Sequence, residues 1–230
     1  MARRTHVGAV PAQFVEPVSI DTEQRRIVAM AASVLLSYPD ERFAESREII
    51  GASLPELPAA IADEFRAFLA ATASMSLREL EEHYVETFDQ RRRCSLFLSY
   101  YSVGDTRQRG TAILAFRQQL RGLGIEEQTQ ELPDHLCVLL EALARVDDAH
   151  HAAAVEMIAS HREGIEVLRS ALENIGSPYV HVIVAVAKSL PRVDEATVFR
   201  YIDLIKSGPP AEMVGITQLP FPTMSSDVNR

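Results

Sequence analysis

The chain has 230 residues, of which 47% are hydrophobic and 24% charged, an ordinary composition for a soluble globular protein. The formal net charge of −9 argues against a general nucleic-acid or anionic-membrane binder, because binding phosphates requires a basic surface. Its two cysteines, Cys94 and Cys137, belong to no C-x-x-C motif or Cys/His cluster. Neither a zinc site nor a disulfide framework is therefore expected, and a reducing cytoplasm fits the composition.

The N-terminal region shows no export signal. Arg3 and Arg4 resemble a twin-arginine start, but Pro11 and Pro17 interrupt any apolar run behind them. No stretch reaches the ~18 apolar residues that a membrane span needs. We therefore expect a cytoplasmic protein without stable membrane association.

The first half of the chain predicts successive helices. Residues 1–20 lack periodicity and are expected to form a flexible arm, after which apolar residues recur at helical spacing. Asp21 or Thr22 caps the first expected helix and Asp40 the second, while Pro58 suits the first turn of a third. The clearest start is the capping box of residues 76–79, which precedes the apolar stripe of Leu77, Leu80, Tyr84 and Phe88.

The second half continues the helical pattern. Asp105 can cap a helix that runs to Gly122 or Gly124, and residues 149–175 predict one helix, or two if Gly164 interrupts it. Further helices are expected after Pro133, after Pro178 and after Asp194, the last ending at Gly208. The sequence thus predicts a single all-α domain of nine or ten helices over residues 21–207, followed by a disordered tail over 208–230.

Positive charge gathers in one part of this acidic chain. Seven arginines stand against three acids between Glu86 and Arg121, so this stretch carries +4 and the remainder −13. The arginines are Arg91, Arg92, Arg93, Arg107, Arg109, Arg117 and Arg121. Aromatic residues lie among them, and tyrosine and arginine are enriched at binding hot spots. One interpretation is that these residues form a surface that docks another protein. The other is that the arginines hold helices together within the fold.

Helical projection separates these arginines. Arg107 and Arg121 share one face of the helix expected after Asp105, whereas Arg109 projects onto its apolar stripe. A buried guanidinium is costly without an acidic partner, so Arg109 is expected to pair with Asp134 or Asp105.

The stretch "ELPDHL", residues 131–136, allows two interpretations. If Pro133 is the first helical residue and Leu132 the cap, Asp134 lies in the first turn and simply meets the positive end of the helix dipole. Alternatively, Asp134 and His135 form an exposed corner that offers a carboxylate and an imidazole to a ligand. Physical argument from the residues leaves both open.

Catalytic and metal motifs are missing. The sequence contains no G-x-S-x-G, H-E-x-x-H, P-loop or G-x-G-x-x-G pattern. Glu79 and His83 are spaced one residue too far for the Glu-x-x-His pair of di-iron bundles, as are Glu131 and His135. Solvated or helix-capping roles are expected for His83, His150, His151 and His161, and a hydrogen-bonded core position for His181.

Two stretches resemble a known family. "YVETFDQRRRCSLFLSYYSVGDTRQRG", which starts at Tyr84, and "ELPDHL" are similar to the NarJ family, the assembly chaperones of respiratory nitrate reductase within the wider TorD/DmsD-like group. The resemblance extends from about Ile27 to Leu190. It implies an all-helical cytoplasmic protein without catalytic activity, cofactor or metal. Such a protein binds the N-terminal segment of the catalytic (alpha) subunit and keeps it competent for molybdenum-cofactor and iron–sulfur insertion before membrane attachment.

The resemblance also suggests a client site. In relatives the acid and histidine of the E-x-P-D-H piece contribute to client-peptide recognition, and by match these are Asp134 and His135. An amphipathic client helix would lie in a groove between helices. The expected groove walls are Tyr84, Phe88, Phe97, Tyr100 and Tyr101, with Arg107 able to meet acidic client residues.

Two other functions remain as alternatives to this reading. A helical metal-dependent enzyme would use His83, His135 and nearby carboxylates, and a regulator would read DNA through residues 91–93. The overall charge and the lack of a basic recognition helix argue against the regulator. The sequence does not decide between monomer and dimer.

Overall fold

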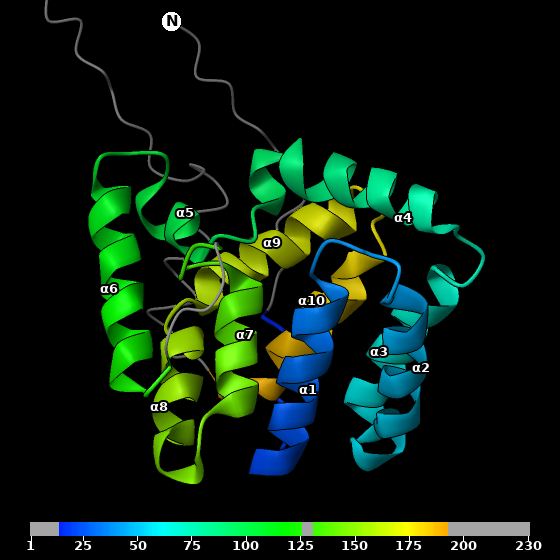
Figure 1. Cartoon of the computed structure of the whole chain (residues 1–230), viewed down its shortest axis with the longest axis horizontal. Coiled ribbons are helices and arrows are strands. Elements are labelled where there is room, and N and C mark those ends of the chain that lie inside the picture. The colour runs from blue at the N-terminus through cyan, green and yellow to red at the C-terminus, as the bar shows by residue number, and fades with distance from the viewer. Residues whose placement is uncertain (1–13, 126–130, 193–230) are drawn as a thin grey trace, which may run out of the picture.

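The computed structural model describes residues 14–125 and 131–192, and these form ten α-helices without a β-sheet (Figure 1). The all-α prediction is therefore confirmed. The helices are α1 (Thr22–Leu35), α2 (Phe43–Ser53), α3 (Ala59–Ala71), α4 (Leu77–Tyr84), α5 (Leu98–Val103), α6 (Gln108–Gly122), α7 (Leu136–Arg145), α8 (Asp148–Ala159), α9 (Arg162–Asn174) and α10 (Tyr179–Ser189). Short turns of helix, Leu54–Glu56, Val85–Asp89 and Arg92–Cys94, join some of them. None of the described helices is long and apolar enough to cross a membrane.

Helix α10 lies at the centre of the packing. It contacts α1, α3 and α9, and α1 also packs along α7. In Figure 1, α1, α2, α6 and α7 stand roughly upright, and α4 and α9 run across them. The run Val182–Ala187 in α10 is almost wholly buried, as its uninterrupted apolar sequence predicts.

Helix α4 begins where its capping box predicts. The Ser76 side chain accepts from the Glu79 amide at 3.3 Å, and the Glu79 carboxylate accepts from the Ser76 amide at 2.8 Å. A π-helical turn over Val85–Asp89 then continues the helix. This turn keeps Tyr84 and Phe88 in the core, where their ring centroids lie 4.8 Å apart.

Residues 149–175 form two helices, and the break falls at Ser160 and His161 rather than at Gly164. Gly164 lies within α9, and a Cβ there would approach the Tyr101 ring to 2.8 Å. The glycine therefore permits close packing of α5 on α9. The helix expected after Asp194, the tail over 208–230 and residues 1–13 lie outside the described residues.

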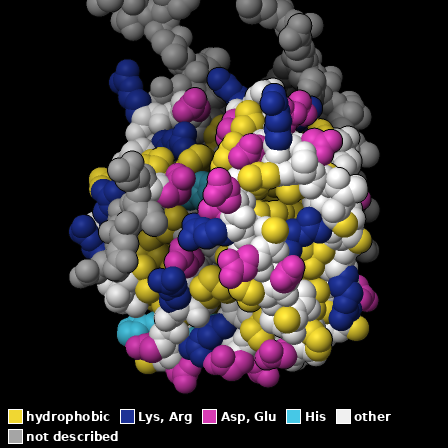
Figure 2. All heavy atoms as spheres, turned by 45° about the vertical axis from the view of Figure 1, so that its right-hand side comes forward, with side chains coloured by type: hydrophobic (Ala, Val, Ile, Leu, Met, Phe, Trp, Pro, Cys, Tyr) yellow, Lys and Arg dark blue, Asp and Glu magenta, His cyan; other side chains and the backbone are white. Residues whose placement is uncertain are grey.

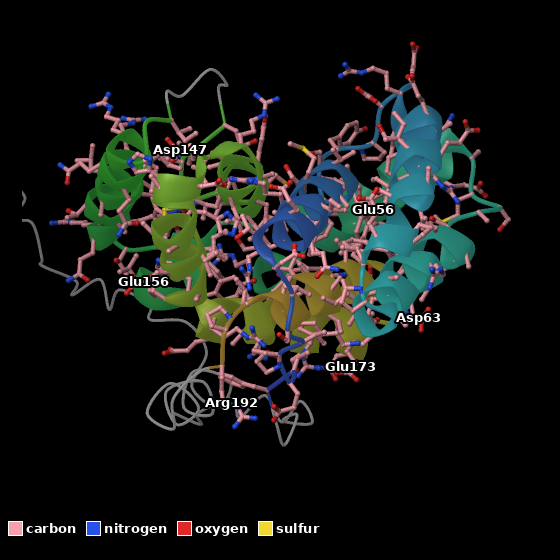
Figure 3. All side chains as sticks on the ribbon, turned by 90° about the horizontal axis from the view of Figure 1, so that it is seen from below. Glu56, Asp63, Asp147, Glu156, Glu173 and Arg192 are labelled. Atoms are coloured by element: carbon pink, nitrogen blue, oxygen red, sulfur yellow. The ribbon has the colours of Figure 1, made fainter. Side chains whose placement is uncertain are left out.

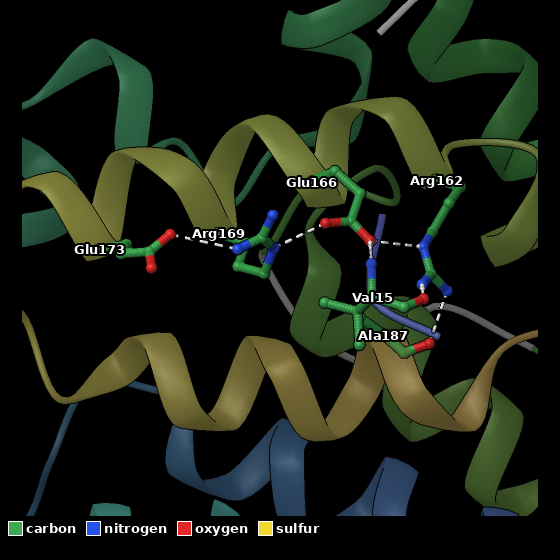
Figure 4. Close-up of polar contacts among 6 residues, drawn as sticks. All are labelled: Val15, Arg162, Glu166, Arg169, Glu173 and Ala187. Carbon is green, nitrogen blue, oxygen red and sulfur yellow. Dashed lines mark hydrogen bonds and ion pairs between the residues drawn. The ribbon is translucent and has the colours of Figure 1, made fainter. Parts of the chain in front are cut away.

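Residues 14–20, which the sequence assigned to a flexible arm, are instead held against the core. Val15 donates its amide to Glu166 Oε1 at 3.1 Å and accepts from Arg162 Nη2 at 2.8 Å (Figure 4). Val18 donates to the Lys188 carbonyl at 2.8 Å. Arg192, labelled in Figure 3, pairs with Glu16 at 3.1 Å. The lack of helical periodicity in residues 14–20 therefore reflects an extended segment that is bound to the core, not a flexible one.

A buried ionic network on α9 receives this segment. Glu166 is fully buried between two arginines, with Arg162 Nε at 3.0 Å from Oε1 and Arg169 Nε at 2.6 Å from Oε2 (Figure 4). Glu173 continues the row at 3.2 Å from Arg169. The network ties α9 to α10, since Arg162 also donates to the Ala187 carbonyl at 2.6 Å.

Candidate functional site

The arginine-rich segment is joined to the "ELPDHL" stretch by a short backbone pairing. Leu98 donates its amide to the Asp134 carbonyl at 2.9 Å, and Leu136 donates to the Leu96 carbonyl at 2.8 Å. Phe97 and His135 face each other in this antiparallel bridge. The two stretches that carry the family resemblance are thus parts of one unit.

Asp134 is fully buried at the centre of this unit. Its Oδ2 accepts a hydrogen bond from the Ser99 hydroxyl at 2.5 Å, and its Oδ1 has no hydrogen-bond partner among the described residues. Helix α7 begins at Leu136, so Pro133 is not its first residue and Asp134 is not in its first turn. Both sequence interpretations of this corner were therefore wrong: Asp134 is neither exposed nor placed on the helix dipole.

His135 occupies the N-cap position of α7. Its Nδ1 accepts a hydrogen bond from the Cys137 amide at 3.3 Å, and its ring packs edge-on to Phe97 with centroids 4.9 Å apart. This acceptor role requires an unprotonated Nδ1. Burial lowers the pKa of His135 from its usual value, which favours the same neutral form.

Arg109 lies between the apolar face of α6 and the bridge. Its Nη1 is 3.8 Å from Asp105 Oδ1, and its guanidinium lies 5.2 Å from the centre of the Phe97 ring. Of the two acidic partners that the sequence allowed, the structure places Asp105 beside it. Its buried Nε makes no hydrogen bond within the described part of the chain.

The outward side of this unit is basic. Arg92, Arg93, Arg107 and Arg121 are exposed, as the helical projection of α6 predicted for the last two. Leu114 shares that face of α6 and is 53% exposed. A mixed basic and apolar surface therefore covers α6 and the turn before α5.

The five aromatic residues expected to form groove walls do not line one open groove. Tyr84, Phe88 and Tyr101 are buried, and only Phe97 and Tyr100 reach the surface in part. The Tyr84 hydroxyl donates to the Leu36 carbonyl at 3.2 Å, within the core. The helical stripes correctly predicted aromatic faces, but most of these faces pack into the core.

The contacts of Tyr101 show why most of these aromatic side chains pack inward. Its hydroxyl donates to the Ser95 and Arg93 carbonyls at 2.8 and 3.0 Å, and its ring packs over Gly164. Tyr101 thus fixes the arginine-rich turn on α9 instead of offering its ring to a ligand. The half-buried Tyr100 packs edge-on beside it, with centroids 5.6 Å apart.

An apolar groove that the sequence did not single out lies between α1 and α2. It has a volume of about 280 Å³. Its lining residues are Ile27, Met30, Ala31, Val34, Ser46, Ile49, Ile50 and Ser53. Ile49 is 64% exposed, and Tyr38, in the adjoining polar depression, is 53% exposed.

His83, His135 and His181 contact different protein groups and do not lie together at one site. His83 lies 3.0 Å from the Ser177 hydroxyl and stacks on Tyr179, whereas His135 lies at the bridge. Half-buried His181 contacts Glu64 at 2.7 Å. Within residues 14–125 and 131–192, no group of three or more His, Cys, Asp or Glu side chains could hold a metal ion. The arrangement therefore gives the metal-enzyme alternative no support.

Comparison with known proteins places the chain in a family. A family model described as the nitrate reductase delta subunit matches residues 53–185, which includes both the bridge and the ionic network. The chain belongs to this family. The matched residues contain both the arginine-rich segment and the start of α7, which lie together in this all-α domain.

Individual relatives give the same family. The chain is 31% identical over 175 residues to the probable nitrate reductase molybdenum cofactor assembly chaperone NarJ of Bacillus subtilis (strain 168), covering 94% of that protein and 74% of this chain. It is 35% identical over 185 residues to the nitrate reductase-like protein NarX of Mycobacterium tuberculosis (strain H37Rv), covering 77% of this chain. The match spans only 27% of NarX. The NarJ chaperone of Escherichia coli (strain K12) is 33% identical over 137 residues, 58% of each chain.

Proposed function

We propose that this chain is a dedicated chaperone for a respiratory nitrate reductase. It binds the N-terminal segment of the catalytic subunit and keeps that subunit competent for molybdenum-cofactor and iron–sulfur insertion before membrane attachment. The observation that carries this proposal is the match to 94% of the Bacillus subtilis protein named as a molybdenum cofactor assembly chaperone.

The proposed role needs no catalytic group in this chain. The relatives are named as assembly chaperones, and Asp134 Oδ2 and His135 Nδ1 accept hydrogen bonds from Ser99 and Cys137 that hold the bridge together. No observation favours the metal-dependent enzyme over the chaperone. The proposal includes a cytoplasmic location, since the client is assembled before it reaches its membrane anchor.

The client-contact residues predicted from the sequence divide by exposure. Phe97, Tyr100 and Arg107 reach the surface beside the bridge, so they can touch a client directly. The remaining five, Tyr84, Phe88, Tyr101, Asp134 and His135, are buried and would act by holding that surface in place. Calorimetry with a client peptide tests this edge through Tyr100→Ala. If its affinity stays within about twofold of wild type, the docking surface lies elsewhere.

A pull-down from anaerobically grown cells tests the function itself. The tagged full-length chain should retain the catalytic subunit of a nitrate reductase, and a client lacking its N-terminal segment should be retained far less. Recovery of no molybdoenzyme subunit would contradict the chaperone role. Equal recovery of full-length and truncated client would leave the chaperone role but refute recognition through the N-terminus.

A further inference from the structure

The groove between α1 and α2 is built from two matching helical stripes. On α1 it is lined by Ile27, Met30, Ala31 and Val34, which are spaced i, i+3, i+4 and i+7. On α2 the same spacing gives Ser46, Ile49, Ile50 and Ser53. This spacing is that of a helix face that packs against another helix. Two such faces turned toward one groove form a cradle for a third helix.

The α1 stripe is additional to the face that holds α1 in the core. Val28, Ala32 and Leu35 are fully buried on the side where α1 packs against α7 and α10. Ile27, Met30 and Val34 are only half-buried and look into the groove. An amphipathic surface helix usually carries one apolar stripe, so a second one that stays open indicates a binding face.

The groove has the dimensions of a short helical contact. From Ile27 to Val34 the α1 stripe rises about 10 Å at ~1.5 Å per residue, which is about two helical turns. Ala31, Ser46 and Ser53 are small and allow close approach of an incoming backbone. The exposed Ile49 side chain provides the large apolar contact on one wall. The shape therefore suits the apolar face of a helix better than a compact small molecule.

The rim of the groove is mainly acidic. Glu45 and Asp40 flank the end near Tyr38, where Arg42 pairs with Asp40 at 3.1 Å. Glu56, labelled in Figure 3, lies at the other end, where its carbonyl accepts from the Gln24 side chain at 2.9 Å. Figure 2 shows acidic and basic side chains interspersed among hydrophobic patches on the face turned toward the viewer. A helix that fits this rim carries lysine or arginine beside its apolar face.

We propose that the α1–α2 groove is the docking site for an amphipathic, basic-flanked helix of the client subunit. This inference rests on the proposed chaperone function and places the client helix in this groove instead of at the edge beside the Phe97–His135 bridge, which Tyr100→Ala tests. A second copy of this chain fits less well, because its net charge of −9 and its own acidic rim would repel the first. The apolar stripes supply the contact area, and the rim selects a basic partner.

Calorimetry with the full-length chain and a synthetic peptide of the client subunit's N-terminal segment tests the inference. Ile49→Asp should weaken binding by about tenfold or more, because it places a charge in the apolar contact. Ile175→Asp after α9 is the control, since Ile175 is also a large exposed hydrophobic residue, at 38% against 64%, and does not line the groove. The control should bind within about twofold of wild type. The Ile49 and Ile175 side chains are both exposed, so both variants are expected to fold, which circular dichroism checks.

A second experiment tests the charge of the rim. It uses Glu45→Lys and a peptide whose lysines and arginines are replaced by glutamate. Each change should weaken binding, and the loss should shrink as salt is raised. Equal binding by wild type and Ile49→Asp would refute the groove while leaving the chaperone function intact. Failure of the peptide to bind wild type would overturn the inference together with N-terminal recognition. If Ile49→Asp instead abolished self-association in sedimentation without changing peptide affinity, the groove would be a dimer face and the inference would fall.

Discussion

Ser99 on α5 donates its hydroxyl to the buried carboxylate of Asp134, 35 residues along the chain, at 2.5 Å. Together with the backbone bond from Leu98 to Asp134, this contact fixes the arginine-rich segment to the start of α7. The acid that the family resemblance marks for client recognition thus has a structural task. Asp134 would affect a client indirectly, by holding in place the exposed residues beside the bridge.

Asp134→Ala is expected to lower the free energy of unfolding by about 1–3 kcal/mol, because it leaves the buried Ser99 hydroxyl without its acceptor. Asp134→Asn keeps an acceptor for Ser99 and should cost less. Urea denaturation of the two variants and of Ser99→Ala measures this. A cost of Asp134→Ala that is no larger than that of Asp134→Asn would contradict the structural role.

The N-cap role of His135 predicts a pH dependence of stability. Burial lowers the pKa of His135 in the folded state, so the unfolded chain, near ~6.5, binds more protons between these two values. Stability should therefore fall as the pH drops below about 6.5, by at most about 1.4 kcal/mol per pH unit for this histidine. Protonation of Nδ1 would also remove the acceptor for the Cys137 amide.

His135→Asn isolates this contribution, because asparagine also caps helices but does not titrate. Unfolding free energies measured from pH 7.5 to 5.5 should fall less steeply for the variant. Three other histidines with lowered pKa values, His83, His151 and His161, remain in both proteins and cancel in the comparison. Parallel curves for variant and wild type would refute the neutral N-cap.

Close packing of α5 on α9 makes Gly164 intolerant of a side chain. Gly164→Ala would bring its Cβ to 2.8–2.9 Å from Tyr101 and should destabilise the fold by about 1–3 kcal/mol. Gly110→Ala in α6 is the control, since nothing lies within 4 Å of a Cβ there. Alanine is the better helix former, so the control should be neutral or stabilising by up to ~1 kcal/mol. Thermal or urea unfolding that ranks the two variants in the opposite order would contradict the packing.

Glu166 should be the most sensitive carboxylate of the ionic network. Glu166→Gln removes the buried charge between Arg162 and Arg169 and should cost about 3–5 kcal/mol, the expected effect of breaking a buried ion pair. Glu173→Gln is the control at the exposed end, where 62% of the side chain is in contact with solvent, and should cost at most ~1 kcal/mol.

Hydrogen exchange gives the same network a second readout. The Val15 amide bonds to Glu166 and the Val18 amide bonds to the Lys188 carbonyl. Glu166→Gln should speed exchange at Val15 more than at Val18. Equal acceleration at both amides would indicate general destabilisation and not release of a specific bond.

The sequence predicted local structure well where local chemistry decides it. The capping box at Ser76 fixed the start of α4, and helical projection identified Arg109 as the inward arginine of α6. The start of α7 was misplaced by three residues because Leu96 and Leu98 pair with the "ELPDHL" stretch. That pairing joins distant segments, so no local pattern reveals it.

The candidate site shows a similar limit. Periodicity identifies an apolar stripe but does not say whether another element covers it. Tyr84 and Tyr101 were expected to line a client groove and lie in the core, whereas Met30 and Ile49, which the sequence assigned to no site, line an open groove. Only the arrangement of α1 and α2 in space distinguishes these cases.

The most direct test of the chaperone account is the molybdenum content of the nitrate reductase catalytic subunit. The subunit would be purified from cells that lack this chain, from cells with the wild-type chain and from cells with the Ile175→Asp control. The account predicts that the subunit accumulates with little molybdenum when the chain is missing and is loaded normally in the other two strains. Equal molybdenum content with and without the chain would contradict it.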